Sequence, residues 1–195
     1  MSSYFKEFAS DSVQPKEFSF TAENLREAKV VLKRYPKDYT EGALMPLLTL
    51  AQKQSQGWLP KKAIEYIASF LKVSEIKVLE IATFYSMYNL CPVGKNHVEV
   101  CTTTPCMLRG SEKILEKCKS FLNLNVGDVT DDNKFSLIEV ECLGACVNAP
   151  VIKIGESYYE DLDDESIEKI LCNLKDGKKI SDGSQINRKG SEPVK

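Results

Sequence analysis

The first half of the chain has the apolar spacing of amphipathic helices. Apolar residues recur at intervals of three and four, which places them on one face of a helix. Four segments share this spacing: residues 21–35, residues 43–55, a segment that starts at residue 60 and a segment that follows residue 74. Thr21 is a candidate N-cap for the first of them. The pattern predicts a helical bundle over residues 21–92, preceded by a polar leader over residues 1–20.

The second half alternates between strand and helix patterns. Near residue 96 the period changes from 3.6 to 2, and β-branched residues become frequent. The predicted elements are a strand at 97–101, a helix at 107–122, a strand at 135–140, a hairpin of 151–154 with 157–159, and a helix at 164–174. This order predicts a mixed α/β domain over residues 93–177. Residues 178–195 have little apolar content and no period, so we expect a tail without regular structure.

Composition and charge exclude several classes of partner. The chain has 26 Lys and Arg residues against 28 Asp and Glu residues, a formal net charge of −2, so we expect no nucleic-acid binding. No stretch approaches the roughly 18 apolar residues of a membrane helix, so we expect no direct membrane insertion. The N-terminus lacks the apolar core of a secretory signal, which favours a cytoplasmic location. In that reducing compartment, cysteines are more often free thiols, metal ligands or redox groups than members of disulfides.

The chain lacks the motifs of a catalytic or dinucleotide-binding protein. It contains one histidine, His97, which excludes a Rieske cluster and a two-histidine zinc finger within the chain. It contains no GxGxxG motif, P-loop, GxSxG or HExxH sequence. We therefore expect no catalytic residues and no bound dinucleotide on this chain.

Four of the seven cysteines form two close pairs. Four residues separate Cys101 from Cys106, and three separate Cys142 from Cys146. Each pair begins where a predicted strand ends, and the 35 residues between the pairs contain one helix and one strand. A strand–helix–strand crossover makes the two strands parallel neighbours, so both pairs are expected at the same sheet edge. Four converging sulfurs suit either zinc or an iron–sulfur cluster.

Several features favour a 2Fe-2S cluster over zinc. Cys106 lies at the predicted start of a helix, and Gly144 lets the backbone of its loop approach an inorganic core closely. Such a core is anionic, and Arg109 and Lys95 are candidates to offset its charge. A structural four-cysteine zinc site uses similar spacing, so spacing does not decide between the two. The remaining thiols are isolated; Cys118 and Cys172 are expected to be core residues, and Cys91 has no close partner in sequence.

The motifs around these pairs resemble a known family. The segments CTTTPCMLRGS and ECLGACVNAPV, with LLTLAQKQSQGWLP and ATFYSMYNL upstream and YYEDL downstream, resemble the thioredoxin-like 2Fe-2S subunits of NADH:quinone oxidoreductase, respiratory complex I. Cys101, Cys106, Cys142 and Cys146 each match a cluster ligand of that family. The resemblance implies a thioredoxin-like domain with a helical extension, one 2Fe-2S cluster, and an electron-transfer role.

The resemblance also implies the partners of the chain. These are a flavin subunit that holds NADH and FMN, with which single electrons are exchanged, and other iron–sulfur subunits, in a complex on the cytoplasmic face of the inner membrane. Related subunits serve NAD-linked hydrogenases and formate dehydrogenases, and this alternative stays open, as does a zinc-binding interaction subunit. The segment SQINRKGSEPV resembles the end of the family. It is a possible docking segment for the flavin subunit, and disorder is the competing interpretation of the tail.

Overall fold

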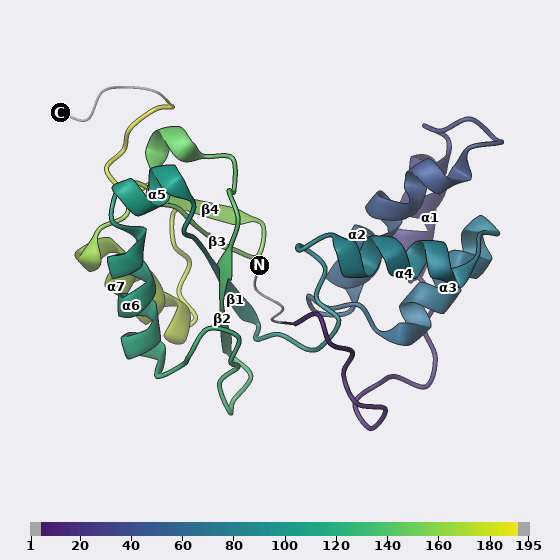
Figure 1. Cartoon of the computed structure of the whole chain (residues 1–195), viewed down its shortest axis with the longest axis horizontal. Helices are drawn as coiled ribbons and strands as arrows, with labels where there is room; N and C mark the ends of the chain where they lie inside the picture. Colours follow the sequence, from purple (N-terminus) through teal and green to yellow (C-terminus); the bar gives the residue numbers. More distant parts are fainter. Residues whose placement is uncertain (1–4, 191–195) are drawn as a thin grey trace. The chain divides into compact units, whose positions relative to one another are not determined.

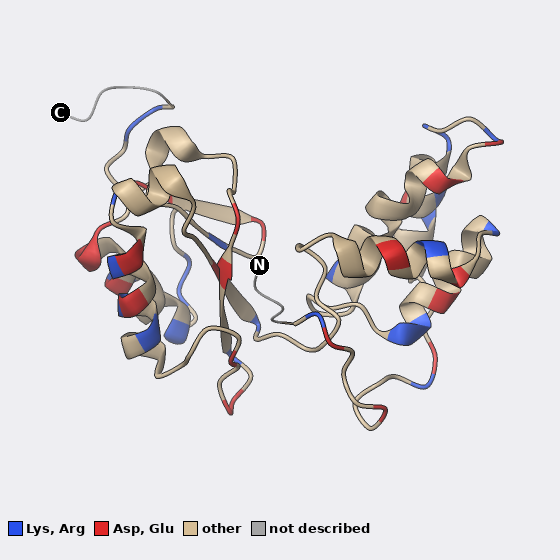
Figure 2. Cartoon of the chain, in the orientation of Figure 1, with Lys and Arg blue, Asp and Glu red and all other residues tan. Residues whose placement is uncertain are grey.

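The computed structural model describes residues 5–190 and contains two compact units with separate cores (Figure 1). The helical unit runs from Phe5 to Pro92, and the sheet unit follows from Val93. Helices precede a mixed sheet, as predicted, so the α/β fold class is confirmed. Positively and negatively charged residues alternate along the ribbon of both units (Figure 2), in keeping with the small net charge of −2.

The helical unit contains the four predicted helices. Its elements are α1 (Ala22–Leu32), the 3-10 turn η1 (Thr40–Ala43), α2 (Leu44–Gln54), α3 (Lys61–Leu71) and α4 (Glu75–Phe84). Thr21 is the N-cap of α1, since its hydroxyl accepts a hydrogen bond from the Asn24 N–H at 3.2 Å. α1 ends at Leu32, short of the expected Tyr35. Leu47, Leu59 and Ile67 are among the side chains buried completely in the core of this unit.

The leader, residues 1–20, is more than a polar extension. Residues 1–4 lie outside the described residues, and residues 5–20 contain neither helix nor strand. Phe5 and Phe20 are nevertheless buried, and the Leu90 N–H donates to the Phe5 carbonyl at 2.7 Å. The side chain of Lys6 donates to the carbonyls of Ala82, in the last turn of α4, and of Tyr88, beyond the end of that helix. Phe20 belongs to the core of this unit. Single buried aromatic residues such as Phe5 and Phe20 produce no periodic pattern in the sequence.

The sheet unit contains five strands and three helices. Its elements are β1 (Asn96–Cys101), α5 (Thr104–Leu108), α6 (Ser111–Leu122), β2 (Phe135–Val140), η2 (Cys146–Asn148), β3 (Ile152–Ile154), β4 (Ser157–Glu160), α7 (Asp164–Lys175) and β5 (Gly183–Ser184). The strand order is β2-β1-β3-β4-β5. β1 and β2 are parallel and β3 and β4 form an antiparallel hairpin, so both predicted pairings are confirmed. α6 and α7 pack beside each other (Figure 1).

The structure differs from the predicted pattern at three places. Gly110, with φ of +92°, interrupts the expected helix over 107–122 and separates α5 from α6. The tail, expected without regular structure, contributes β5, which pairs in parallel with β4. Two residues of backbone pairing on an exposed strand edge need no apolar period, so the sequence pattern could not predict them. Cys172 is exposed instead of buried, because it lies off the apolar stripe formed by Ile167, Ile170 and Leu171.

Within the described residues, no helix is both long enough and apolar enough to span a bilayer. This agrees with the hydropathy pattern of the sequence, in which charged residues interrupt every apolar segment.

The only histidine of the sequence is expected to make the sheet unit acid-sensitive. His97 lies on β1, where its Nδ1 is 2.7 Å from the Ser136 hydroxyl. Burial, followed by the nearby Lys153 ammonium, lowers the pKa of His97 to about 4. The unfolded chain takes up a proton near pH 6.5, whereas the folded chain takes it up only near pH 4. The free energy of unfolding therefore decreases as the pH is lowered from about 6.5 to about 4, by up to about 1.4 kcal/mol per pH unit.

Denaturant unfolding of the wild type and of His97→Gln over this pH range measures the effect. As the pH is lowered, the free energy of unfolding of the wild type should decrease relative to that of His97→Gln, because only the wild type has this histidine. A constant difference would contradict the buried neutral histidine.

Candidate metal centre

Both cysteine pairs lie at the same edge of the sheet. Cys101 is the last residue of β1 and is paired in register with Val140, the last residue of β2. Cys142 follows two residues later. The parallel crossover thus brings together two segments that are 35 residues apart, as the spacing predicted. The loops around both pairs, residues 101–108 and 142–151, contain no charged residue, and α5 is drawn without charged positions in Figure 2.

The first pair is buried. Cys101 and Cys106 are each 2% exposed and belong to a small apolar cluster with Ala149 and Val151. The Cys101 N–H donates to the Val151 carbonyl at 3.2 Å, which fixes the end of β1. Cys106 is the third residue of α5. The protein interior therefore holds these two sulfurs in fixed positions.

The second pair lies at the surface. Cys142 is exposed and Cys146, the first residue of η2, is partly exposed. Their sulfur atoms are 3.3 Å apart, and the Gly144 N–H approaches the Cys142 sulfur at 3.4 Å. Gly144 has φ of +82°, a conformation that favours glycine, and the space beside its Cα is open. This loop leaves room for a bulky group next to the two sulfurs.

Thr103 connects the two pairs. Its hydroxyl is 3.3 Å from the Cys101 sulfur and also interacts with the Cys142 sulfur. Among the described residues, no set of three or more His, Cys, Asp or Glu side chains is grouped closely enough to hold a single metal ion. The donors thus form two adjacent pairs rather than one compact set of four. Two pairs of thiolates fit a core with two iron atoms, each of which takes two, and four thiolates also fit a tetrahedral zinc.

Within each pair, one thiol has a lowered pKa and the other a raised pKa. Burial acts to raise the pKa of Cys101, but hydrogen bonds from Thr103 and the Leu143 backbone outweigh it and lower the pKa. Burial and the neighbouring Cys101 raise the pKa of Cys106 to about 12. In the second pair, the Gly144 N–H lowers the pKa of Cys142, and the hydrogen bond to Cys142 raises that of Cys146. A metal bound by all four thiolates must therefore displace protons.

The other thiols and Lys95 lie outside the two segments that carry the paired cysteines. Cys118 is completely buried on α6, as expected, and Cys172 is exposed on α7. Cys91 belongs to the helical unit, where burial, followed by the charge of Glu7, raises its pKa. Lys95 precedes β1 and so lies at the end of that strand opposite Cys101, which corrects its expected position beside the cysteines. Lys95 is close to Cys101 in sequence, but the extended strand β1 separates the two residues.

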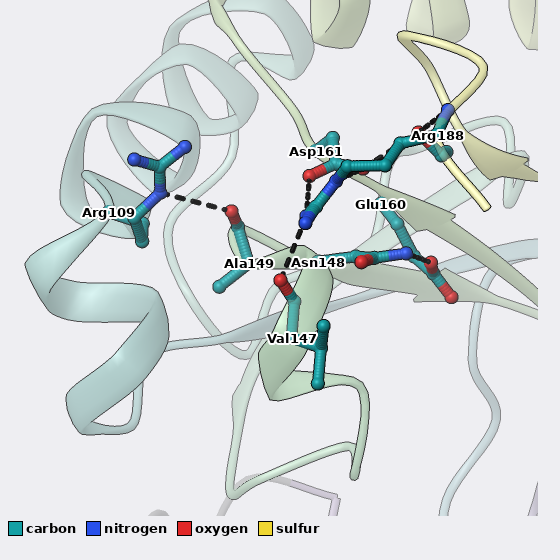
Figure 3. A network of polar contacts seen from close by, with 8 residues as sticks. Arg109, Val147, Asn148, Ala149, Glu160, Asp161 and Arg188 are labelled. Atoms are coloured by element: carbon teal, nitrogen blue, oxygen red, sulfur yellow. Dashed lines mark hydrogen bonds and ion pairs between the residues drawn. The ribbon is translucent and has the colours of Figure 1, made fainter. Parts of the chain in front are cut away.

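Two arginines reach the backbone beside Cys146. Arg109, singled out from the sequence, lies with its Nε 3.5 Å from the Ala149 carbonyl. Arg188, in the tail, donates to the Val147 carbonyl at 2.8 Å and forms an ion pair with Asp161 (Figure 3). Sequence reasoning missed Arg188 and Asp161, because a single long-range ion pair leaves no pattern in the sequence.

Comparisons with known proteins agree with this arrangement. Residues 28–175 match the thioredoxin-like 2Fe-2S ferredoxin family. An NADH-quinone oxidoreductase subunit of Rickettsia bellii is 54% identical over 158 residues, which cover 81% of this chain and 95% of that protein. The mitochondrial NADH dehydrogenase (ubiquinone) flavoprotein 2 of Dictyostelium discoideum is 48% identical over 175 residues, 90% of this chain and 71% of that protein.

Among solved structures, a chain of an NAD⁺-reducing NiFe-hydrogenase superposes with a TM-score of 0.57 and 16% identity, over 67% of this chain and 23% of that chain. At this identity the superposition shows a shared fold only. The family match and the relatives confirm the resemblance read from the cysteine motifs. The chain belongs to the thioredoxin-like 2Fe-2S ferredoxin family and, within it, to the subunits of that family found in NADH-quinone oxidoreductase.

Proposed function

We propose that Cys101, Cys106, Cys142 and Cys146 ligate one 2Fe-2S cluster, and that the chain carries single electrons in the NADH-oxidising module of NADH:quinone oxidoreductase. The observation that carries this proposal is the convergence of two cysteine pairs, one buried and one at the surface, at one sheet edge. When bound, the cluster accepts and releases one electron at a time. Four sulfur donors in two pairs, an open loop at Gly144 and nearby arginines fit such a group.

The chain's own residues divide the work at this site. Cys101 and Cys106 hold the inner side of the centre, and the Thr103 hydroxyl and Gly144 N–H supply hydrogen bonds to sulfur that stabilise negative charge. Cys142 brings the outer side to the surface. The apolar side chains of Met107, Leu108 and Val147 are 46%, 76% and 61% exposed and lie on the elements that carry the cysteines. Such a rim suits contact with another protein.

The partner is proposed to be a flavin subunit that binds NADH and FMN. NADH releases two electrons as a hydride, and a one-electron carrier needs a flavin to separate them. No dinucleotide motif is present in this chain, so the NADH site belongs elsewhere in the complex. Contact with the flavin subunit and with other iron–sulfur subunits would also place the chain at the cytoplasmic face of the inner membrane, without a membrane span of its own.

The isolated chain with a reconstituted cluster is expected not to oxidise NADH, because nothing in it accepts a hydride. Addition of the flavin subunit should make NADH bleach the visible absorption of the cluster, measured anaerobically. Oxidation of NADH by the pure chain would refute the division of labour. A colourless holoprotein with stoichiometric zinc would refute the cluster itself and favour the interaction subunit.

The reduction potential is expected to be low, on the order of −400 mV, the value of all-cysteine plant-type clusters. Four thiolates stabilise the oxidised form, and no histidine other than His97, which lies at the start of β1, is available to replace one. A potentiometric titration followed by electron paramagnetic resonance measures it. A positive midpoint would show that hydrogen bonds to sulfur outweigh the ligand type.

A further inference from the structure

Three consecutive backbone carbonyls that follow Cys146 are bound from outside their own loop. The Val147 carbonyl accepts from Arg188 at 2.8 Å, and the Asn148 carbonyl accepts from the Asp161 N–H at 2.7 Å. The Ala149 carbonyl accepts from Arg109 at 3.5 Å (Figure 3). Three donors from three different segments therefore hold the backbone immediately after one of the four cysteines.

Asp161 and Arg188 form the centre of this arrangement. Their side chains are 3% and 9% exposed, and the guanidinium contacts both carboxylate oxygens, with Nε 3.2 Å from Oδ2. The Ser184 hydroxyl donates to the same carboxylate at 2.7 Å and accepts from the Arg188 N–H at 3.0 Å. Asp161 thus holds the η2 backbone through its own N–H and holds Arg188 through its side chain.

The loop that carries the two surface cysteines is only partly packed. The side chain of Val147 is 61% exposed, Cys142 is exposed, and the Gly144 Cα has open space beside it. Leu143 and Ala145 pack against the small apolar cluster around Cys101, and the Asn148 side-chain amide donates to Glu160 at 2.6 Å. The ion pair of Arg188 with Asp161 adds to these contacts from outside the loop. A buried ion pair contributes little net stability but strongly favours one geometry, because loss of either partner leaves a buried charge unpaired.

We propose that Arg188, oriented by Asp161, is a positioning residue for Cys146, and that the tail segment 183–190 is part of the support of the metal centre. This inference rests on the proposed function, since it concerns the ligand role of Cys146. It assigns the described part of the tail to a contact within its own unit, through β5 and Arg188, where the sequence suggested a partner-docking segment or disorder.

The test uses the full chain with its 2Fe-2S cluster reconstituted. Arg188→Gln, Asp161→Asn and the double variant are compared with the wild type and with Lys179→Gln, which makes the same charge change as Arg188→Gln at an exposed position of the same tail. Cluster loss to an iron chelator is followed by the decay of visible absorption, and the reduced cluster is examined by electron paramagnetic resonance. Unfolding of each apoprotein is measured in parallel.

We expect Arg188→Gln and Asp161→Asn each to lose the cluster about tenfold faster than the wild type, the range for a charged hydrogen bond, with shifted resonance g values. The double variant should lose it no faster than the worse single variant, because the two residues act as one unit. Lys179→Gln should behave as the wild type. Arg188→Lys keeps the positive charge but lacks the planar guanidinium, so it should lose the cluster at an intermediate rate. This variant replaces Arg188→Gln in the comparison if Arg188→Gln does not fold.

Wild-type rates and spectra in Arg188→Gln, with the cluster present, would overturn this inference alone. The inference would also be overturned if the variant lost the cluster faster but kept the wild-type spectrum and lost apoprotein stability to the same extent. Arg188 would then only stabilise the fold in general. A wild-type chain that takes up no 2Fe-2S cluster would overturn the proposed function as well.

Discussion

Serine in place of Cys101 or Cys106 is expected to abolish the 2Fe-2S cluster, with iron content falling from about two atoms per chain to well below one. Both sulfurs are 2% exposed inside a packed cluster, so no water or distant thiol can replace them. A serine hydroxyl stays protonated near neutral pH and is a poorer ligand for iron than a thiolate. Iron and sulfide analysis and the visible spectrum measure the loss.

Cys142→Ser and Cys146→Ser should reduce or destroy the signal too. Cys172→Ser is the matched control, because Cys172 is exposed on α7 and its replacement disturbs no packing. Cys91→Ser, in the helical unit, should also retain the cluster. Loss of the cluster in Cys91→Ser together with its retention in Cys101→Ser would defeat the ligand assignment.

Gly94→Ala is expected to destabilise the sheet unit by about 3 kcal/mol. A Cβ at this position would lie 2.6 Å from both the Phe135 carbonyl oxygen and the Ser136 nitrogen, and closer still to the Phe135 carbonyl carbon. These are backbone atoms of β2, so they cannot move without disturbing the parallel pairing of β1 with β2. The Gly94 N–H also donates to the buried Ser136 hydroxyl at 2.9 Å, a contact that the displaced backbone would lose.

Gly155→Ala separates this clash from the general cost of replacing glycine. Gly155 has φ of +62° in the turn between β3 and β4, and a Cβ there would meet open space. Its expected cost is the roughly 1–2 kcal/mol of a left-handed conformation alone. Denaturant unfolding of both apoproteins gives the comparison, and equal costs would contradict the close approach of Gly94 to β2.

Most of the regular structure could be predicted because it depends on local periodicity. β2 occupies the predicted residues, and the helix that begins at Asp164 follows an apolar stripe that ends one residue before its observed end at Lys175. The convergence of the cysteine pairs could also be predicted, since it follows from the parallel crossover rule and needs no side-chain detail.

Contacts that depend on one residue could not be predicted in this way. Arg188 lies 27 residues from Asp161 and 41 from Val147, and neither separation corresponds to any period. The burial of Phe5 in the leader likewise depends on a single residue. Lys95 and Cys172 show the opposite error, since closeness in sequence or an apolar neighbour suggested a position that strand direction and helix phase do not allow.

The division of the chain at Pro92 and Val93 separates its optical reporters. The single tryptophan of the sequence, Trp58, belongs to the helical unit, whereas all four proposed ligands belong to the sheet unit. Indole fluorescence therefore reports on the surroundings of the helices, and the charge-transfer colour of bound iron reports on the other half. One heated sample followed at both wavelengths would give one melting curve from each unit, and a midpoint taken from fluorescence alone would leave out the unit that holds the proposed ligands.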